Sequence, residues 1–235
     1  MKKRLPAILI LLAAFVLSAC NGNNAAPPLP VQTGDTIQFG ELDWRVLYVQ
    51  DNAALLITEN VIKNMAYHDA EEGVTWAASD IRQYLNGAFY GSFSVADRER
   101  IAATSLLNND NQWFGTPAGN DTVDKIFLLS IEEVVQHFGD SGMFARGIDP
   151  NERTQGFMFD PDVFGIYGFG IHDRYSIARV AANVDGEVLW WWLRSPGMSA
   201  YNAAGVFYEG YILLTNILAT SPTCGIRPAL WLYID

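Results

Sequence analysis

The first twenty residues limit most strongly what the rest of this chain can be. A basic segment, Lys2-Lys3-Arg4, precedes an apolar run from Leu5 to Ala19, and Cys20 follows directly. A basic start, a short apolar run and small residues before a cleavage point are typical of a secretory signal peptide. The run is shorter than the roughly 20 apolar residues that a membrane-spanning helix needs. We therefore expect residues 1–19 to be removed and the remainder to be exported.

The segment Leu17-Ser18-Ala19-Cys20 resembles the lipobox of bacterial lipoproteins. This resemblance implies that the Cys20 sulfur carries diacylglycerol, which ties the chain to the cell membrane or the outer membrane, facing the cell exterior or the periplasm. Residue 21 is Asn and not the Asp that resembles an inner-membrane retention signal, so in a two-membrane cell we expect the outer membrane. The chain has 2 Cys, so a lipidated Cys20 would leave Cys224 without a disulfide partner, and packing must stabilise the fold.

The part after the anchor is expected to be one acidic domain. Residues 20–32 are rich in Asn, Ala and Pro, which is the composition of a spacer, and the folded domain is expected over residues 33–235. The whole chain has a formal charge of −11 at pH 7, and loss of the basic leader makes it more negative. Such a surface repels phosphate backbones, so nucleic acid is not expected as a partner. The length is sufficient for a substantial core.

Local patterns predict both strands and helices. Alternating apolar residues from Ile37 to Ile57 fit two strands joined by tight turns. Further strands are predicted at Lys125–Leu129, Val188–Leu193, Ala204–Tyr208, Tyr211–Leu214 and Gly225–Leu232. Helices are predicted to begin after Ser79, Ser94 and Ser130, because each serine can cap the helix that follows it. Glu133 completes a capping box with Ser130, and Gly139 is placed to stop that helix.

The segment from Leu107 to Tyr175 is rich in Gly, Asn, Asp and aromatic residues. Loops this long usually carry function, and so many aromatic residues argue against disorder. We expect ordered, irregular loops that contact an extracellular ligand. The candidate ligand contacts are Trp113, Tyr167, His172, Asp173, Arg174 and Tyr201.

Part of this segment also offers oxygen ligands for a cation. Asn109, Asp110 and Asp121 are the candidate ligands, and hard oxygen atoms at high density suit Ca²⁺. No twelve-residue EF-hand pattern is present. Asn and Asp are also ordinary turn residues, so solvated turns are the competing interpretation.

Four separated motifs stand out in the chain. They are Thr75-Trp76 with Ser79-Asp-Ile-Arg-Gln-Tyr-Leu-Asn86, then Phe89 with Phe93-Ser94, then Trp192-Leu-Arg-Ser-Pro-Gly197, and Gly225-Ile-Arg-Pro-Ala-Leu-Trp231. In this order they resemble the DUF6273 family of exported bacterial domains. The resemblance runs from about Thr33 to Asp235. The pattern is also similar to C-type-lectin-like and formylglycine-generating-enzyme-like domains. That likeness implies an α+β fold: an irregular antiparallel sheet with two or three flanking helices, long loops, and paired N- and C-terminal strands.

The motif residues are expected to be structural. The candidates for the core are Trp76, Trp192, Arg194, Arg227 and Trp231. A guanidinium could clamp a carboxylate of a ligand, but both arginines lie in apolar strands beside proline. We favour arginines that bond loop carbonyls or a buried acid. Of Trp190-Trp191-Trp192, one exposed ring could instead stack on a sugar.

Enzyme motifs are not evident in the sequence. There is no Gly-x-Ser-x-Gly elbow, and His68, His137 and His172 are scattered without a zinc-binding pattern. The Glu-Pro-Asn, Gln-Pro-Asp and Trp-Asn-Asp triplets of sugar-binding lectins are missing, as is the cysteine pair of a formylglycine-generating oxidase. Paired carboxylates of glycoside hydrolysis leave no spacing rule in a sequence. We expect a surface-tethered, non-catalytic domain that recognises a glycan or a protein; a glycan-processing envelope enzyme and a structural envelope protein are the alternatives.

Overall fold

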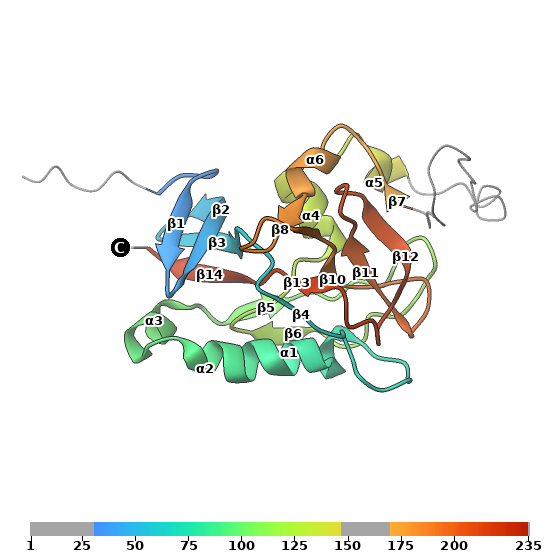
Figure 1. Ribbon diagram of the computed structural model, residues 1–235, viewed down its shortest axis with the longest axis horizontal. Coiled ribbons are helices and arrows are strands. Elements are labelled where there is room, and N and C mark those ends of the chain that lie inside the picture. Colours follow the sequence, from blue (N-terminus) through green and yellow to red (C-terminus); the bar gives the residue numbers. More distant parts are fainter. Residues whose placement is uncertain (1–30, 147–169, 235) are drawn as a thin grey trace, which may run out of the picture. The chain divides into compact units, whose positions relative to one another are not determined.

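Two antiparallel-rich sheets and several short helices make up the part of the chain that the computed structural model describes, residues 31–146 and 170–234 (Figure 1). The fold is mixed α+β, as predicted, and strands dominate it. Residues from Val31 onward belong to one compact unit. Within the described ranges, no helix has the length and apolar character needed to cross a membrane.

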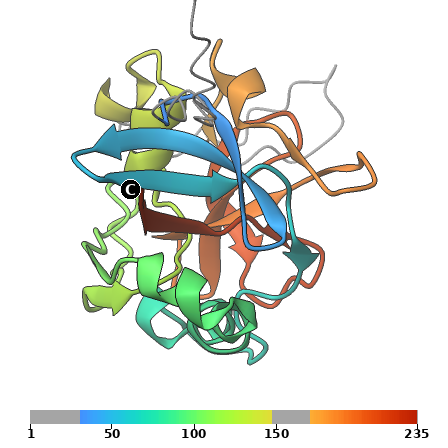
Figure 2. The ribbon, with the colours of Figure 1, turned by 90° about the vertical axis from the view of Figure 1, so that its left-hand side faces the viewer.

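The first sheet, called the N-terminal sheet, has the order β1-β2-β3-β14. Its strands are β1 (Thr36–Phe39), β2 (Leu42–Gln50), β3 (Ala53–Thr58) and β14 (Ala229–Tyr233), each antiparallel to its neighbour. Figure 2 views the molecule from this side, with β2 and β3 next to each other. Residues 37–57 therefore contain three strands, where two were predicted, because Gly40, at φ 60°, turns the chain between β1 and β2.

The second sheet has the order β4-β13-β10-β11-β12-β7. Its strands are β4 (Lys63–Asn64), β13 (Gly225–Ile226), β10 (Trp191–Pro196), β11 (Asn202–Val206), β12 (Ile212–Leu218) and β7 (Gly170–Ile171). Only β10 and β13 pair in parallel among these described strands. Two small ladders complete the strands: β5 (Thr104–Leu106) with β6 (Thr122–Asp124), and β8 (Ala181–Ala182) with β9 (Val188–Leu189).

Short helices lie on two sides of the sheets (Figure 1). They are η1 (Trp76–Ala78), α1 (Asp80–Tyr84), the π-helical η2 (Leu85–Phe89), α2 (Tyr90–Ser92), α3 (Val95–Arg100), α4 (Ile131–Phe138), α5 (Met143–Arg146) and α6 (Ser176–Arg179). The predicted caps are confirmed: the hydroxyls of Ser79, Ser94 and Ser130 accept backbone N–H groups of the first turns of α1, α3 and α4. Glu133 completes the capping box, and Gly139, at φ 96°, ends α4.

The predicted strand Val188–Leu193 divides at Trp190 into β9 and β10, and two other predicted strands are interrupted because they pass between the two main sheets. The stretch Gly225–Leu232 breaks at Pro228, which has no N–H to donate, so β13 joins the second sheet and β14 joins the N-terminal sheet. The stretch Lys125–Leu129 forms no regular strand. Phe127 makes an isolated bridge to Ala229, and the Leu129 carbonyl accepts the Arg194 N–H at 3.0 Å, which links this stretch to both sheets.

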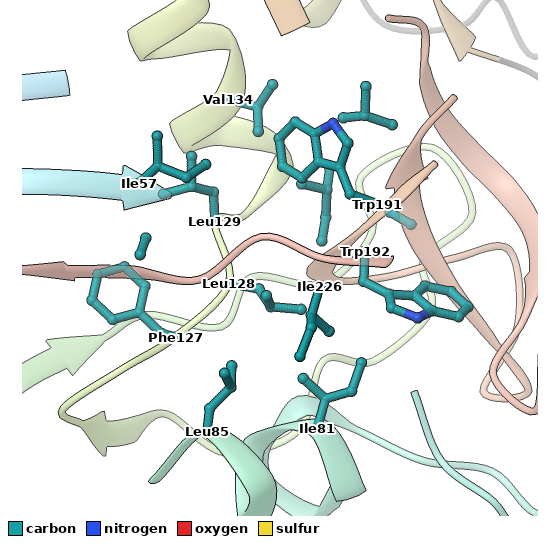
Figure 3. Close-up of a cluster of buried hydrophobic side chains, with 14 of the residues drawn as sticks. Ile57, Ile81, Leu85, Phe127, Leu128, Leu129, Val134, Trp191, Trp192 and Ile226 are labelled. Carbon is teal, nitrogen blue, oxygen red and sulfur yellow. The ribbon is translucent and has the colours of Figure 1, made fainter. Parts of the chain in front are cut away.

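The core lies where these crossing segments meet β10 and the helices (Figure 3). Trp191 and Trp192 are both 0% exposed and point to opposite sides of β10, as alternation along a strand requires. The Trp191 ring lies 6.4 Å from that of Phe138 in α4, and the Trp192 ring 5.5 Å from that of Tyr67. Cys224 is also buried, and burial raises the pKa of its thiol well above the usual range.

The strand arrangement departs from the lectin-like expectation in two respects. The described residues form two main sheets, not one. The C-terminal strand β14 pairs with β3, the third strand along the chain, and not with β1. The C-terminal strand therefore returns to the N-terminal sheet, but on the opposite edge from the strand that begins it.

Candidate functional site

The β11–β12 hairpin ends in a tight turn that is rich in aromatic residues, Phe207–Tyr211. The Phe207 N–H donates to the Tyr211 carbonyl, and the Gly210 N–H to the Phe207 carbonyl, both at 2.8 Å. Gly210 has φ 83°, and a Cβ there would lie 1.8 Å from the Ser176 carbonyl oxygen. Only glycine combines this backbone conformation with such a close approach, so the hairpin tip is held against the start of α6.

Four rings and one imidazole gather at this tip, and we call them the aromatic face: Trp190, Phe207, Tyr208, Tyr211 and His172. Ring centroids of Trp190 and Phe207 are 4.3 Å apart, those of Phe207 and Tyr208 3.8 Å, and those of His172 and Tyr211 3.9 Å. Tyr208 is 41% exposed and Phe207 8%, so part of the face meets solvent and part supports it.

Glu209 lies between the two tyrosines of this turn. Its side chain is half-buried, and its Oε2 atom is buried without a hydrogen-bond partner within the described part of the chain. Burial raises the pKa of this carboxyl, against smaller opposing effects of its own backbone N–H and of the charge of His172. Burial, followed by the nearby charges of Glu209 and Tyr208, also raises the pKa of Tyr211. A partly desolvated carboxyl therefore lies in the same turn as the exposed ring of Tyr208.

A family model, Domain of unknown function (DUF6273), matches residues 51–234, and thus most of the chain. The chain belongs to the DUF6273 family. No curated protein and no solved structure matches it. The matched region begins at the β2–β3 turn and includes the whole aromatic face, whereas the sequence resemblance was expected to start near Thr33.

Three of the predicted ligand contacts of this DUF6273 domain are consecutive residues with different roles. His172 is exposed and belongs to the aromatic face. Asp173 has a side chain that is 3% exposed, forms an ion pair with Arg179 at 3.1 Å, and accepts N–H groups of the neighbouring loops. Arg174 is exposed and lies over the Tyr175 ring, 4.9 Å from its centroid. Only His172 of these three therefore contributes to the aromatic face.

The other predicted ligand contacts are not brought to this face. Trp113 is 3% exposed and packs edge-on against Phe144 at 5.4 Å, so its ring has no open side for a ligand. Tyr201 is 56% exposed but lies in the β10–β11 turn, at the opposite end of β11 from the aromatic face. Tyr167 lies outside the described residues.

Arg194 is enclosed by acceptors. Its Nε donates to Asn108, its Nη1 to the Leu128 carbonyl and Glu133, and its Nη2 to the Leu107 carbonyl and Glu133. These bonds use all five N–H groups of the guanidinium. The hollow beside it, which Leu107, Ser130 and Ala118 also line, has no room for a water molecule. Arg194 therefore has no donor left for a ligand carboxylate.

Arg227 is 0% exposed and donates to the Thr58 and Glu59 carbonyls at 2.8 and 3.1 Å. Its guanidinium lies 5.3 Å from the Trp191 ring centroid and 5.7 Å from that of Phe138. Burial lowers the pKa of Arg227 to about 9. The residue links the β13–β14 connection to the end of β3 from within the core.

The three motif tryptophans differ in exposure. Trp76 is buried and its Nε1 donates to Asp124 at 2.9 Å, while Trp192 Nε1 donates to the Met65 carbonyl at 2.9 Å. Trp231 is half-buried and meets the Tyr48 ring edge-on at 6.3 Å. It lies at the rim of the core and not inside it.

The candidate calcium ligands act as turn acceptors and donors. Asp110 accepts the Ala118 N–H and Asp121 the Asn108 N–H, at 2.9 and 2.8 Å, while Asn109 reaches Glu132 at 3.5 Å. Among the described residues, no group of three or more His, Cys, Asp or Glu side chains is arranged to hold a metal ion. Calcium binding stays a prediction, which melting temperatures with calcium and with a chelator would test.

Sequence reasoning identified His172 and allowed one unspecified ring of Trp190-Trp191-Trp192 to stack on a sugar, but it missed Tyr208, Glu209 and Tyr211. The local signal was present, since Phe207-Tyr-Glu-Gly-Tyr211 combines three aromatic residues, an acid and a turn glycine. The rest of the face comes from the residue after β7 and the residue before β10, far away in sequence. No periodicity along the chain indicates that these segments meet.

Proposed function

We propose that this chain is a surface-tethered bacterial lipoprotein whose DUF6273 domain binds an extracellular glycan without catalysis. The observation that carries the proposal is the aromatic face together with Glu209, which lies in the same turn near His172 and Tyr211. Sugar rings present apolar C–H faces that stack on aromatic rings, and their hydroxyls donate to carboxylates. Tyr208 supplies an exposed ring and Glu209 supplies the acceptor.

The membrane attachment is the second part of this proposal. The leader and Cys20 lie outside the described residues, so support comes from their sequence alone. A lipid on Cys20 and the spacer of residues 20–32 would hold the domain close to the membrane that carries it. In this arrangement the domain meets glycans outside the cell or in the periplasm.

We further infer a C-type-lectin-like relationship for the fold. Two features support it: the sheets are irregular, with register shifts between β10 and β11, β11 and β12, and β2 and β3, and the helices are short. The aromatic face, at the tip of a hairpin in the second sheet, is in keeping with ligand contacts made by loops at one side of such a domain.

Calorimetric titration of the full chain, purified in detergent, with a panel of soluble oligosaccharides tests the glycan proposal. We expect at least one oligosaccharide to bind, and Tyr208→Ala to weaken that binding roughly tenfold through the loss of stacking. Tyr48→Ala is the matched control, because Tyr48 is 46% exposed but lies on the N-terminal sheet. If no oligosaccharide binds, or if both variants bind like the wild type, the proposal fails. Hydrolysis of a bound oligosaccharide would make the domain an enzyme.

A further inference from the structure

We propose that the glycan recognised at the aromatic face carries a protonated amino group, and that Glu209 is the counter-ion of that group. The inference rests on the proposed function and names the chemical class of its ligand: an amino sugar whose nitrogen is not acylated. It follows from two features of the hairpin tip that favour a cation, the aromatic rings and the carboxyl of Glu209.

The rings provide the first part of the argument. The face of an aromatic ring carries partial negative charge and attracts a cation within about 6 Å of its centroid. Trp190 has ring neighbours at 4.3 Å and 6.1 Å, Phe207 and Tyr208, so several π faces are concentrated around one small area. Tyr208, 41% exposed, is the ring of this group that offers a face to a ligand ammonium, and the buried Phe207 ring packs against it.

The carboxylate provides the second part. The Oε2 atom of Glu209 is buried. Within the described ranges it has no hydrogen-bond partner, and Glu209 forms no ion pair with a described residue. A desolvated carboxylate without a cation is costly, and a ligand ammonium would relieve that cost. The imidazole of His172 lies near this carboxyl and packs against the Tyr211 ring, with 3.9 Å between the ring centroids.

The neighbouring arginines provide the third part, because they are already engaged. The hairpin tip rests on Ser176, and Arg174 and Arg179 flank this residue in the same segment. Arg179 forms an ion pair with Asp173 at 3.1 Å, and the Arg174 guanidinium lies over Tyr175. Neither one therefore neutralises Glu209. The chain as a whole has a formal charge of −11, which also disfavours uronic and sialic acids.

Three short oligomers of the same length test the inference: glucosamine, N-acetylglucosamine and glucose. Each is titrated into the full chain in detergent at two salt concentrations. We expect the glucosamine oligomer to bind about tenfold more tightly than the other two, and added salt to reduce that preference. Glu209→Gln, which keeps the shape and removes the charge, should abolish the preference and leave the weaker binding of the uncharged oligomers.

Glu71→Gln is the matched control, because it removes one exposed acid from the loop before η1 and changes the net charge equally. The Glu71→Gln variant should still bind the glucosamine oligomer more tightly than the other two oligomers. Equal binding of all three oligomers, or a preference that survives Glu209→Gln, would overturn the amino-sugar inference while the glycan proposal stands. Binding of none of the oligomers in this and the wider panel would remove the glycan proposal itself.

Discussion

At the scale of single residues, Arg194 is the side chain whose replacement should cost most. Its five N–H groups donate to Asn108 and two carbonyls in loops and to Glu133 in α4. Replacing the guanidinium with an uncharged group leaves some of these acceptors unpaired. We expect Arg194→Gln to lower the free energy of unfolding by about 3–5 kcal/mol, as for broken buried pairs. Arg194→Lys should recover little, because an ammonium cannot reproduce the planar fork. Urea denaturation measures both.

Arg174→Gln serves as the control for Arg194, because Arg174 is exposed and lies over an aromatic ring. Its cost should stay below about 1 kcal/mol. Equal unfolding midpoints for the Arg194→Gln variant and the wild type would mean that the guanidinium does not hold these segments together.

Asp173 should make stability depend on pH. Burial alone would raise the pKa of its carboxyl, but the Ser141 N–H, the charge of Arg179 and the Tyr175 N–H together lower it. The folded-state pKa is below the unfolded value, so this stabilisation is present above the unfolded pKa, about 3.9, and disappears as pH falls through the folded value. Asp173→Asn should therefore be destabilised at neutral pH and lose less stability on acidification. Melting temperatures of the wild type and of Asp173→Asn from pH 7 to pH 2 would show this difference. Parallel curves for the two proteins would mean that Asp173 is not the source of the pH dependence.

At the scale of elements, the hairpin tip depends on Gly210. Gly210→Ala puts a methyl group 1.8 Å from the Ser176 carbonyl oxygen, so the turn must move away from α6. Gly186→Ala is a close control, since Gly186 has φ 84° against 83° for Gly210, and its Cβ would meet nothing within 4 Å. Both variants carry the same backbone strain, about 1–2 kcal/mol. Only Gly210→Ala should lose more stability than this backbone strain explains, and it should also weaken ligand binding. Similar losses of stability in the two variants would mean that the close approach of Gly210 to Ser176 is unimportant.

Elements could be predicted from the sequence where their signals are local. Ser79, Ser94 and Ser130 each act within one helical turn, so the starts of α1, α3 and α4 were predictable. The division of Gly225–Leu232 into β13 and β14 was not, because it depends on two sheets that come together only in the folded chain. The aromatic face was missed for the same reason: Tyr208 and Trp190 meet through strand pairing, which leaves no pattern within either segment.

At the scale of the whole molecule, attachment to the membrane should depend on one cysteine. We expect cells that express the chain with Cys20→Ala to incorporate no labelled fatty acid into it. Cys224→Ala is the control, because this second cysteine is 1% exposed and its thiol is kept protonated by burial.

The two cysteine variants also separate anchoring from folding. Cys224→Ala should keep the lipid label and the membrane fraction, at most with a modest loss of stability from the small cavity that it leaves. Cys20→Ala should keep the melting temperature of the domain, because residues from Val31 onward form their own compact unit. Label that persists in Cys20→Ala would contradict the lipoprotein proposal without affecting the aromatic face. Loss of label with an unchanged melting temperature would instead place the anchor at Cys20 and the stability in the domain that follows it.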